Sequence, residues 1–393
     1  MPSVKKNFSF ILFRLRGFGN AKLLENEVDF LPKEVKIPAD GRVFTPEMQA
    51  EIKTTQIDMR NRLLMLAAPA VMAWYYYGGR AVLLIALSAL TAMLCEYIGM
   101  RVLGQVPALR DMSAALIGVT VALLLPASAP IWLVLLATSF AILVVKVPFG
   151  TARTLLFSPA AAGVAFVAVC LPDYVFSYPV LPENGAAVAV YGSEGFATGV
   201  SLTQMLQSST SMGVTAADYI DVLIGNTPSA MGTGCVIALI GALLFLAVRA
   251  PKGFTAAMSC LFGAAVYAFL FPRITTGRLQ SVFMELSGGM LFFAALFLLP
   301  EDSILPKRFW GRVAYGVSAG VITMLFRRFG ALEEGAVFAV LLCNALTSAF
   351  DKLPVARFER RAKQQARKKR READGAPAAP ADALTEQGGG ADA

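Results

Sequence analysis

The sequence predicts an all-α integral membrane protein with about ten transmembrane helices in two groups of five. Three observations predict this fold class: 56% of the 393 residues are hydrophobic, only 16% are charged, and the mean hydropathy is +0.61. An ordinary soluble domain contains fewer apolar and more charged residues. Because a helix needs about 20 apolar residues to cross a bilayer, the apolar residues suffice for roughly ten spans, loops and tails.

The chain has no histidine, and its five cysteines occur singly. The lack of histidine excludes histidine-ligated haem or metal and histidine-based acid–base catalysis. Without a C-x-x-C pair, the cysteines are interpreted as small apolar packing residues, with an iron–sulfur cluster shared with another subunit as the alternative. The sequence therefore predicts no catalytic residue and no metal site in this chain.

Residues 1–60 are expected to form an N-terminal arm on the cytoplasmic side. Its run Phe8–Phe13 is interrupted by Arg14 and Arg16 too early for a secretory signal or a span. The mixture of phenylalanine and basic residues predicts an interfacial amphipathic helix. The Pro-bounded stretch Leu31–Pro38 is expected to be extended, and either docks on a partner subunit or is flexible.

The apolar runs divide into a first repeat, residues 61–171, and a second repeat, residues 233–351. The individual runs are residues 62–79, 81–104, 113–126, 130–148, 158–171, 233–250, 254–272, 285–300, 309–328 and 335–350. Runs 113–126 and 285–300 are short for a full span. Short segments at matching places in two halves predict broken helices around a site at the membrane midplane.

Two pairs of similar sequence segments indicate that the two groups of apolar runs are copies of one unit. One run ends in Leu-Leu-Pro126 and another in Leu-Leu-Pro300, and similar segments begin 37 residues later at Gly163 and 35 residues later at Gly335. Because each unit has five spans, the second copy must be inverted in the membrane.

The positions of lysine and arginine predict that both termini are cytoplasmic. Residues 352–371 hold ten of the 35 basic residues, whereas segment 172–232 holds none. The short connections on the inner side carry nine basic residues, Lys146 among them, against five on the outer side. Those five are Arg80, Arg273, Arg278, Arg327 and Arg328.

Segment 172–232 is therefore expected to be a long extracytoplasmic loop, and its tyrosines and phenylalanines favour a folded cap over a linker. Residues 352–393 are expected to be a cytoplasmic tail, basic at first and then disordered. The positive charge is interpreted as a membrane anchor on the lipid bilayer, and no nucleic-acid partner is predicted.

Two features could carry chemistry. Gly232 and Gly234 open the sixth apolar run, where free N–H groups favour a phosphate; the alternative is that they ease the chain into a membrane helix. Glu96 lies within an apolar run with Arg101 little more than one turn further on. It is either an acid for ion transport or the partner of Arg101 near the membrane surface.

Five motifs stand out in the sequence: Leu123–Trp132, Ser158–Gly163, Gly225–Gly232, Ser287–Leu291 and Arg328–Ala345. They resemble those of the D subunit of the Rnf complex and of the homologous B subunit of the sodium-pumping NADH:quinone reductase. The resemblance implies an inverted five-helix repeat similar to urea transporters. It also implies a subunit of an ion-translocating oxidoreductase that passes electrons between NADH and ferredoxin in a prokaryotic cytoplasmic (inner) membrane, with other membrane and peripheral Rnf subunits as partners.

The family resemblance further implies FMN joined through its phosphate to an outer-loop threonine, in a pattern like Asp-x-x-Ser/Thr-x-Ala-Thr-Pro-Leu. In the best ungapped match, Glu194–Leu202, the acceptor position is occupied by Val200, which has no hydroxyl. Either the register moves to Thr198 or Ser201, or the FMN, or riboflavin, is bound noncovalently or lost. Thr198 follows an alanine, as the family's acceptor does, and is the preferred choice.

Two other functions remain open. One is a non-redox transporter or channel for small solutes on the same scaffold, and the other is a purely structural assembly subunit. The first would work alone, whereas a redox subunit would need its partners.

Overall fold

The computed structural model describes residues 46–103, 112–149, 155–180, 197–208, 216–273, 277–330 and 333–352. The chain divides into two units, residues 1–55 and 56–393, and the features below belong to the second, apart from residues 46–55 at the start of α2. The interfacial helix and extended arm predicted before residue 46, part of the predicted cap, and the tail after residue 352 lie outside the described residues.

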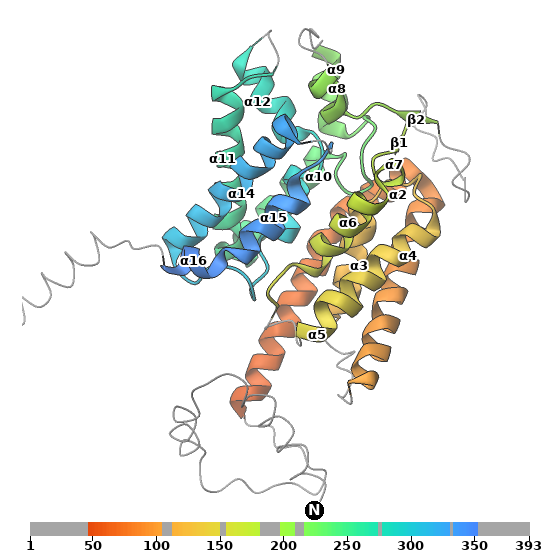
Figure 1. The fold of residues 1–393 in the computed structure, drawn as a ribbon, viewed down its shortest axis with the longest axis vertical. Helices are drawn as coiled ribbons and strands as arrows, with labels where there is room; N and C mark the ends of the chain where they lie inside the picture. Colours follow the sequence, from red (N-terminus) through yellow and green to blue (C-terminus); the bar gives the residue numbers. More distant parts are fainter. Residues whose placement is uncertain are drawn as a thin grey trace, which may run out of the picture. The chain divides into compact units, whose positions relative to one another are not determined.

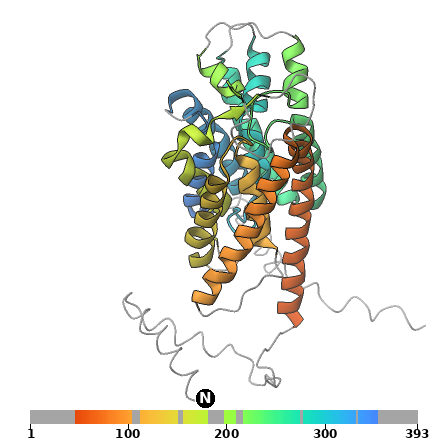
Figure 2. The same ribbon diagram turned by 90° about the vertical axis from the view of Figure 1, so that its right-hand side faces the viewer.

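In the described parts of the first repeat predicted from the sequence, every regular element is a helix (Figure 1). Its longest helix, α2, breaks at Gly78, whose φ of 60° and ψ of −143° are not helical. Figures 1 and 2 show both arms of α2 descending from this break. The helices are α2 (Pro46–Val102), α3 (Ser113–Leu124), α4 (Ile131–Phe140), the π-helical turn η3 (Ala141–Lys146), α5 (Val147–Phe149) and α6 (Pro159–Cys170).

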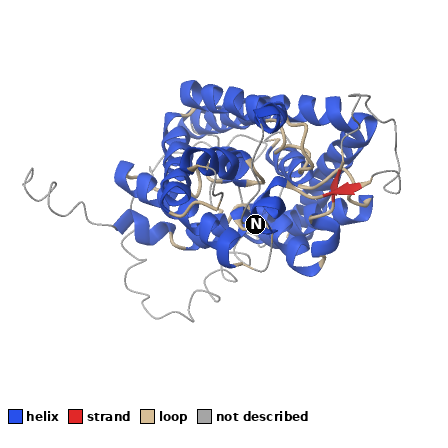
Figure 3. Ribbon diagram, turned by 90° about the horizontal axis from the view of Figure 1, so that it is seen from above, coloured by secondary structure: helices blue, strands red, loops and turns tan. Residues whose placement is uncertain are grey.

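Short elements follow between the two repeats. Strands β1 and β2 pair antiparallel, with Tyr178 opposite Gly199 and Pro179 opposite Thr198, and Figure 3 shows them as the small red sheet among blue helices. We call the end of the bundle that carries these elements the loop face; it is uppermost in Figure 1. The elements are α7 (Pro172–Val175), β1 (Tyr178–Pro179), β2 (Thr198–Gly199), α8 (Leu202–Ser208) and α9 (Ala216–Ile224).

The second repeat predicted from the sequence is also helical. Its helix near the loop face is discontinuous: α12 and the segment formed by α13 and η5 are bent by 66°. The elements are α10 (Val236–Arg249), α11 (Pro251–Leu270), α12 (Arg278–Ser287), α13 (Leu291–Phe293), η5 (Ala294–Leu298), α14 (Phe309–Phe329), α15 (Ala336–Ala345) and α16 (Thr347–Lys352).

Length and apolar character identify four helices in the described residues that can cross a membrane, or five if the bent pair is one span. Four further apolar helices are shorter. Large apolar side chains such as Leu90, Leu244 and Val248 are more than half exposed, as expected for a surface that faces lipid. The all-α, multi-pass membrane fold is confirmed, whereas the count of ten spans and the inverted repeat stay predictions.

Helices α11 and α14 pack closely because α14 presents glycine to its neighbour. A Cβ atom at Gly316 would collide with Ser259, and one at Gly320 would collide with the carbonyl of Cys260. Gly316 and Gly320 form a G-x-x-x-G pattern, which lets membrane helices approach through their backbones. This tight pair positions the end of α14 beside the break in α12.

Candidate functional site at the break between α12 and α13

The break is made by Gly288, Gly289 and Met290 between the end of α12 and the start of α13. Gly289 has φ of 65°, a left-handed conformation that glycine adopts without strain. A Cβ atom there would also collide with the carboxylate of Glu334 and the guanidinium of Arg327. The chain can therefore turn here only because position 289 is glycine.

Arg327, in the last turn of α14, caps the broken end of α12. Its Nη1 donates to the carbonyl of Glu285 at 2.7 Å, and its Nη2 donates to the carbonyl of Gly288 at 2.7 Å. The last carbonyls of a helix have no partner within the helix, and in an apolar bundle water cannot supply one. The 1% exposed arginine satisfies two of them.

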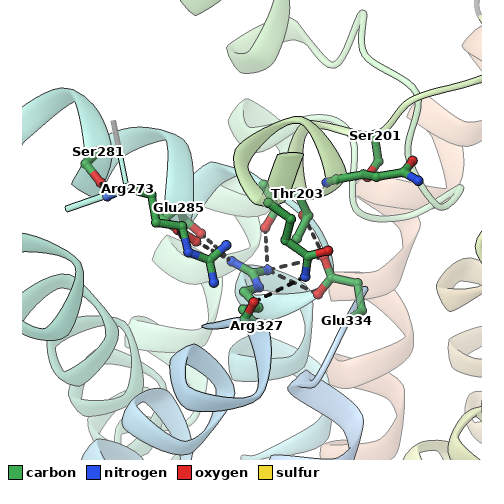
Figure 4. A network of polar contacts seen from close by, with 10 residues as sticks. Ser201, Thr203, Arg273, Ser281, Glu285, Arg327 and Glu334 are labelled. Atoms are coloured by element: carbon green, nitrogen blue, oxygen red, sulfur yellow. Dashed lines mark hydrogen bonds and ion pairs between the residues drawn. The ribbon is translucent and has the colours of Figure 1, made fainter. Parts of the chain in front are cut away.

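The charge of Arg327 is balanced by two buried carboxylates (Figure 4). Its Nη2 lies 3.2 Å from Glu334 Oε2, and its Nη1 lies 3.4 Å from Glu285 Oε2. Glu285 also forms an ion pair with Arg273, whose Nε lies 3.2 Å from Oε1. Both glutamates are 1% exposed, and buried charges are tolerated only when they are paired in this way.

Two hydroxyls join the start of α8 to the segment before α15. The Thr203 hydroxyl donates to Glu334 Oε1 at 2.7 Å, and the Ser201 hydroxyl donates to the carboxylate of Glu333. Figure 4 shows Thr203 directed at Glu334, beside Arg327. These two hydrogen bonds therefore anchor the loop that carries the expected flavin motif beside the break between α12 and α13.

A small cavity of about 10 Å³ lies next to Ser201 and is lined by Tyr178, Ser229 and Glu333 among others. It has room for about one water-sized group. Burial raises the pKa of Glu333 to about 7, against the opposing effect of the hydrogen bond from Ser201. At neutral pH this carboxyl can therefore accept or release a proton beside a hydroxyl.

The two predicted hydroxyl positions differ in their surroundings. Thr198 is exposed on β2, and Val200 is 47% exposed, whereas Ser201 is 5% exposed and bonded to Glu333. Both hydroxyls stay predictions as flavin acceptors. In the structure, Ser201 contacts Glu333 beside the buried cluster of Arg327 and Glu334, whereas Thr198 lies on the surface.

The two predicted glycines also differ. The N–H of Gly232 donates to the carbonyl of Leu123 at 2.7 Å, so it is not the free donor that a phosphate site at this position requires. Its lack of a side chain has a packing reason, because a Cβ atom would meet Leu123 and Phe293. Gly234 lines the small cavity beside Ser201.

Glu96 pairs with a different residue from the one expected. Its Oε1 lies 2.6 Å from Lys146 Nζ, and the lysine also donates to Ser113 at 2.7 Å. Arg101 instead lies over the ring of Tyr97, 5.3 Å from its centroid. The prediction of an Arg101 partner was wrong because Lys146 reaches Glu96 from another helix.

Three basic residues assigned to short connections are in fact buried. Lys146 is 2% exposed, Arg80 is 2% exposed, and Arg327 is 1% exposed. Arg80 donates to the carbonyls of Ala127 and Ala129, just after α3, at 3.3 and 2.8 Å. The positions of these three basic residues therefore reflect helix capping and ion pairing, and not only the side of the membrane on which their connections lie.

Sequence reasoning missed the cluster of Arg327 with its two glutamates. A signal was present: a doubled glycine at 288–289, an arginine pair at the end of an apolar run, and a doubled glutamate a few residues later. Each of these alone resembles an ordinary loop. Together they are what a discontinuous membrane helix needs for its backbone and its counter-charges.

A bundle of apolar helices with a paired polar cluster at a helix break is the architecture of a multi-pass membrane protein with a discontinuous helix. The model of the NQR2, RnfD, RnfE family matches residues 44–358, so the chain belongs to this family. The resemblance seen in the sequence motifs is thereby confirmed.

Curated relatives are similar over most of their length. The D subunit of an ion-translocating oxidoreductase complex from Colwellia psychrerythraea is 28% identical over 318 residues, covering 74% of this chain and 90% of the relative. The D subunit of a Na(+)-translocating ferredoxin:NAD(+) oxidoreductase complex from Acetobacterium woodii is 26% identical over 308 residues, covering 78% of this chain and 91% of the relative.

Proposed function

We propose that the chain is the D-type membrane subunit of an Rnf-type complex that couples electron transfer between NADH and ferredoxin to ion movement. The observation that carries this proposal is the family match over residues 44–358, which includes every described transmembrane helix. The names of the relatives from Colwellia and Acetobacterium support the same role. In this role the protein is a translocase subunit of a prokaryotic cytoplasmic membrane, and it works with other membrane and peripheral subunits.

The proposal includes a flavin on the loop face, attached through its phosphate to Ser201. A phosphoester needs a hydroxyl, and Ser201 is one residue from the position that Val200 occupies in the ungapped motif. Its hydrogen bond to Glu333 supports this choice over Thr198, because a neighbouring carboxylate can accept the hydroxyl proton when the serine oxygen attacks the flavin phosphate of a phosphoanhydride donor and the P–O bond to the second phosphate breaks.

The hydroxyl of Ser201 suits the attachment, but the cavity beside it has room for neither the phosphate nor the ring system. About 10 Å³ accommodates a single small group, so the isoalloxazine would lie outside this cavity, on the loop face. When bound, the flavin supplies the redox chemistry. Ser201 would carry the flavin phosphate, and Glu333 would hold the proton released by the Ser201 hydroxyl. Arg327 would keep the neighbouring Glu334 in place.

The function is tested by purifying the tagged, full-length chain in mild detergent. We expect it to bring down other membrane subunits that carry iron–sulfur and flavin centres, because this chain lacks histidine and a C-x-x-C pair. A partner-free, monodisperse protein that passes a small solute in vesicles would instead establish the transporter alternative.

A further inference from the structure

A second pocket on the loop face shares Arg327 with the site described above. It has a volume of about 480 Å³. Among the described residues, its lining contains three arginines and no carboxylate. We call it the arginine pocket; it is lined by Leu206, Gln207, Pro272, Arg273, Arg327, Arg328 and Gly330.

The arginines bring donors that have no acceptor. Arg273 uses its Nε for Glu285, and within the described ranges its Nη1 and Nη2 are buried without a hydrogen-bond partner. Within the same ranges, the Nε of Arg327 is also buried without a hydrogen-bond partner. A buried donor without a partner is unfavourable, and a charged one more so, which makes an acceptor from a ligand the natural completion of this site.

The charges near the arginine pocket point to an anion. Arg273, Arg327 and Arg328 bring three positive charges, while Glu285 and Glu334 pair with the first two. Burial lowers the pKa of Arg273, and Glu285 only partly opposes this effect. Among the described residues, Arg328 is exposed and forms no ion pair with a carboxylate, so its charge is available to a bound anion.

The position of the pocket matches the level of lipid headgroups. Arg328 lies over the rings of Phe271 and Phe329, with 5.5 and 6.0 Å to their centroids. These rings stand at the ends of two membrane-spanning helices and are 50% and 76% exposed. Aromatic and basic side chains at the ends of spans are typical of the boundary between membrane and water.

We propose that the arginine pocket binds a phosphate group, supplied by an anionic lipid headgroup or by free phosphate. A phosphate offers several acceptor oxygens, and guanidinium groups bind it in pairs of parallel hydrogen bonds. Arg273 and Arg328 would supply the donors from two helix ends, while Arg327 remains committed to the break in α12.

The test is native mass spectrometry of the purified full-length chain, titrated separately with phosphatidylglycerol, phosphatidylcholine and inorganic phosphate. We expect phosphatidylglycerol to bind in preference to phosphatidylcholine. Arg273→Gln and Arg328→Gln should each weaken this binding about tenfold, the loss expected for a charge-assisted hydrogen bond. Competition by inorganic phosphate would identify free phosphate as the source, and its absence would identify the lipid.

A matched control is available in α12. Arg278 lies over Phe269, 5.6 Å from the ring centroid, and does not line the pocket, so Arg278→Gln should leave binding unchanged. Arg328 is exposed and pairs with neither glutamate, so its variant should fold even if the Arg273 variant does not. The proposal is overturned if the wild-type chain binds none of the anionic probes, or if Arg278→Gln weakens binding as much as Arg328→Gln. Neither result depends on whether flavin is attached at Ser201.

Discussion

Arg327 joins the three polar features of the loop face. It caps the carbonyls of α12, it neutralises Glu285 and Glu334, and its own carbonyl accepts from Gln207 of α8 at 3.2 Å. A buried arginine of this kind stabilises one geometry of the break rather than the fold in general. The hydroxyl of Ser201 and the carboxyl of Glu333 are positioned against that fixed geometry.

The flavin attachment is a prediction about a single hydroxyl. After denaturing electrophoresis, the purified chain should show flavin fluorescence under ultraviolet light, because a phosphoester survives denaturation. Ser201→Ala should abolish the signal, since alanine cannot form the ester, while the neighbouring control Thr198→Ala should retain it. Loss of signal in Thr198→Ala with retention in Ser201→Ala would move the site to β2 and contradict the proposal.

Glu333 predicts a pH dependence of stability. Its pKa is raised to about 7 from an ordinary value of 4.5, mainly by burial, with Glu334 adding to the shift and Ser201 and Arg327 opposing it. The folded protein therefore binds a proton more tightly than the unfolded chain, so the contribution of Glu333 is most favourable below about pH 4.5 and is lost as pH rises through about 7.

The measurement is the melting temperature of the detergent-solubilised chain across this range. The wild-type value should fall between pH 5 and 7 by more than that of Glu333→Gln, whose amide does not titrate. Equal slopes for the two proteins would show that Glu333 is ionised in the folded state throughout and would contradict its raised pKa.

At the scale of elements, the sequence predicted helices better than the contacts between them. The apolar run 309–328 agrees with α14 (Phe309–Phe329), and the expected boundary between the first two runs, residue 80, lies two residues after the Gly78 break in α2. Helix position follows from local apolar length, which the sequence contains directly. The short run 285–300 was expected to be a broken helix, and α12 and α13 are bent by 66° there.

Charged partners could not be predicted in the same way. Lys146 is 50 residues from Glu96, and Arg327 is 42 residues from Glu285, so each pair depends on how separate helices pack. A lysine or arginine at the end of an apolar run has the same local pattern whether it faces water or a buried acid. Helix α14 packs on α11, and Arg327 at its end bonds to backbone carbonyls at the end of α12, so this pairing depends on how separate helices pack.

The turn between α12 and α13 requires glycine at position 289, and this requirement can be tested by substitution. Gly289→Ala should reduce the free energy of unfolding by at least about 1–2 kcal/mol, because alanine resists the left-handed conformation and its Cβ would collide with Glu334. Gly241→Ala is the control, since nothing lies within 4 Å of a Cβ atom at that position in α10. Thermal unfolding in detergent measures both, and an unchanged Gly289→Ala would contradict the described turn.

Across the described part of the molecule, buried charges occur toward both ends of an apolar bundle. Arg80 and Arg327 cap backbone carbonyls near the loop face, and the ion pair of Glu96 with Lys146 lies toward the other end, near α5 (Figure 1). Ser201, with its partner Glu333, and the arginine pocket are both on the loop face. The orientation of this face therefore decides from which side of the membrane an electron-transfer partner or an anion reaches them.

The loop face is expected to be extracytoplasmic, because segment 172–232 has no lysine or arginine while residues 352–371 have ten. The prediction can be tested in a variant in which the five native cysteines are replaced. A membrane-impermeant maleimide should label Val200→Cys on the loop face in intact cells, since this position is 47% exposed. Lys307→Cys, exposed between η5 and α14, should react only after the membrane is opened. The reverse pattern would place both termini outside, and it would place Ser201 and the arginine pocket on the cytoplasmic surface.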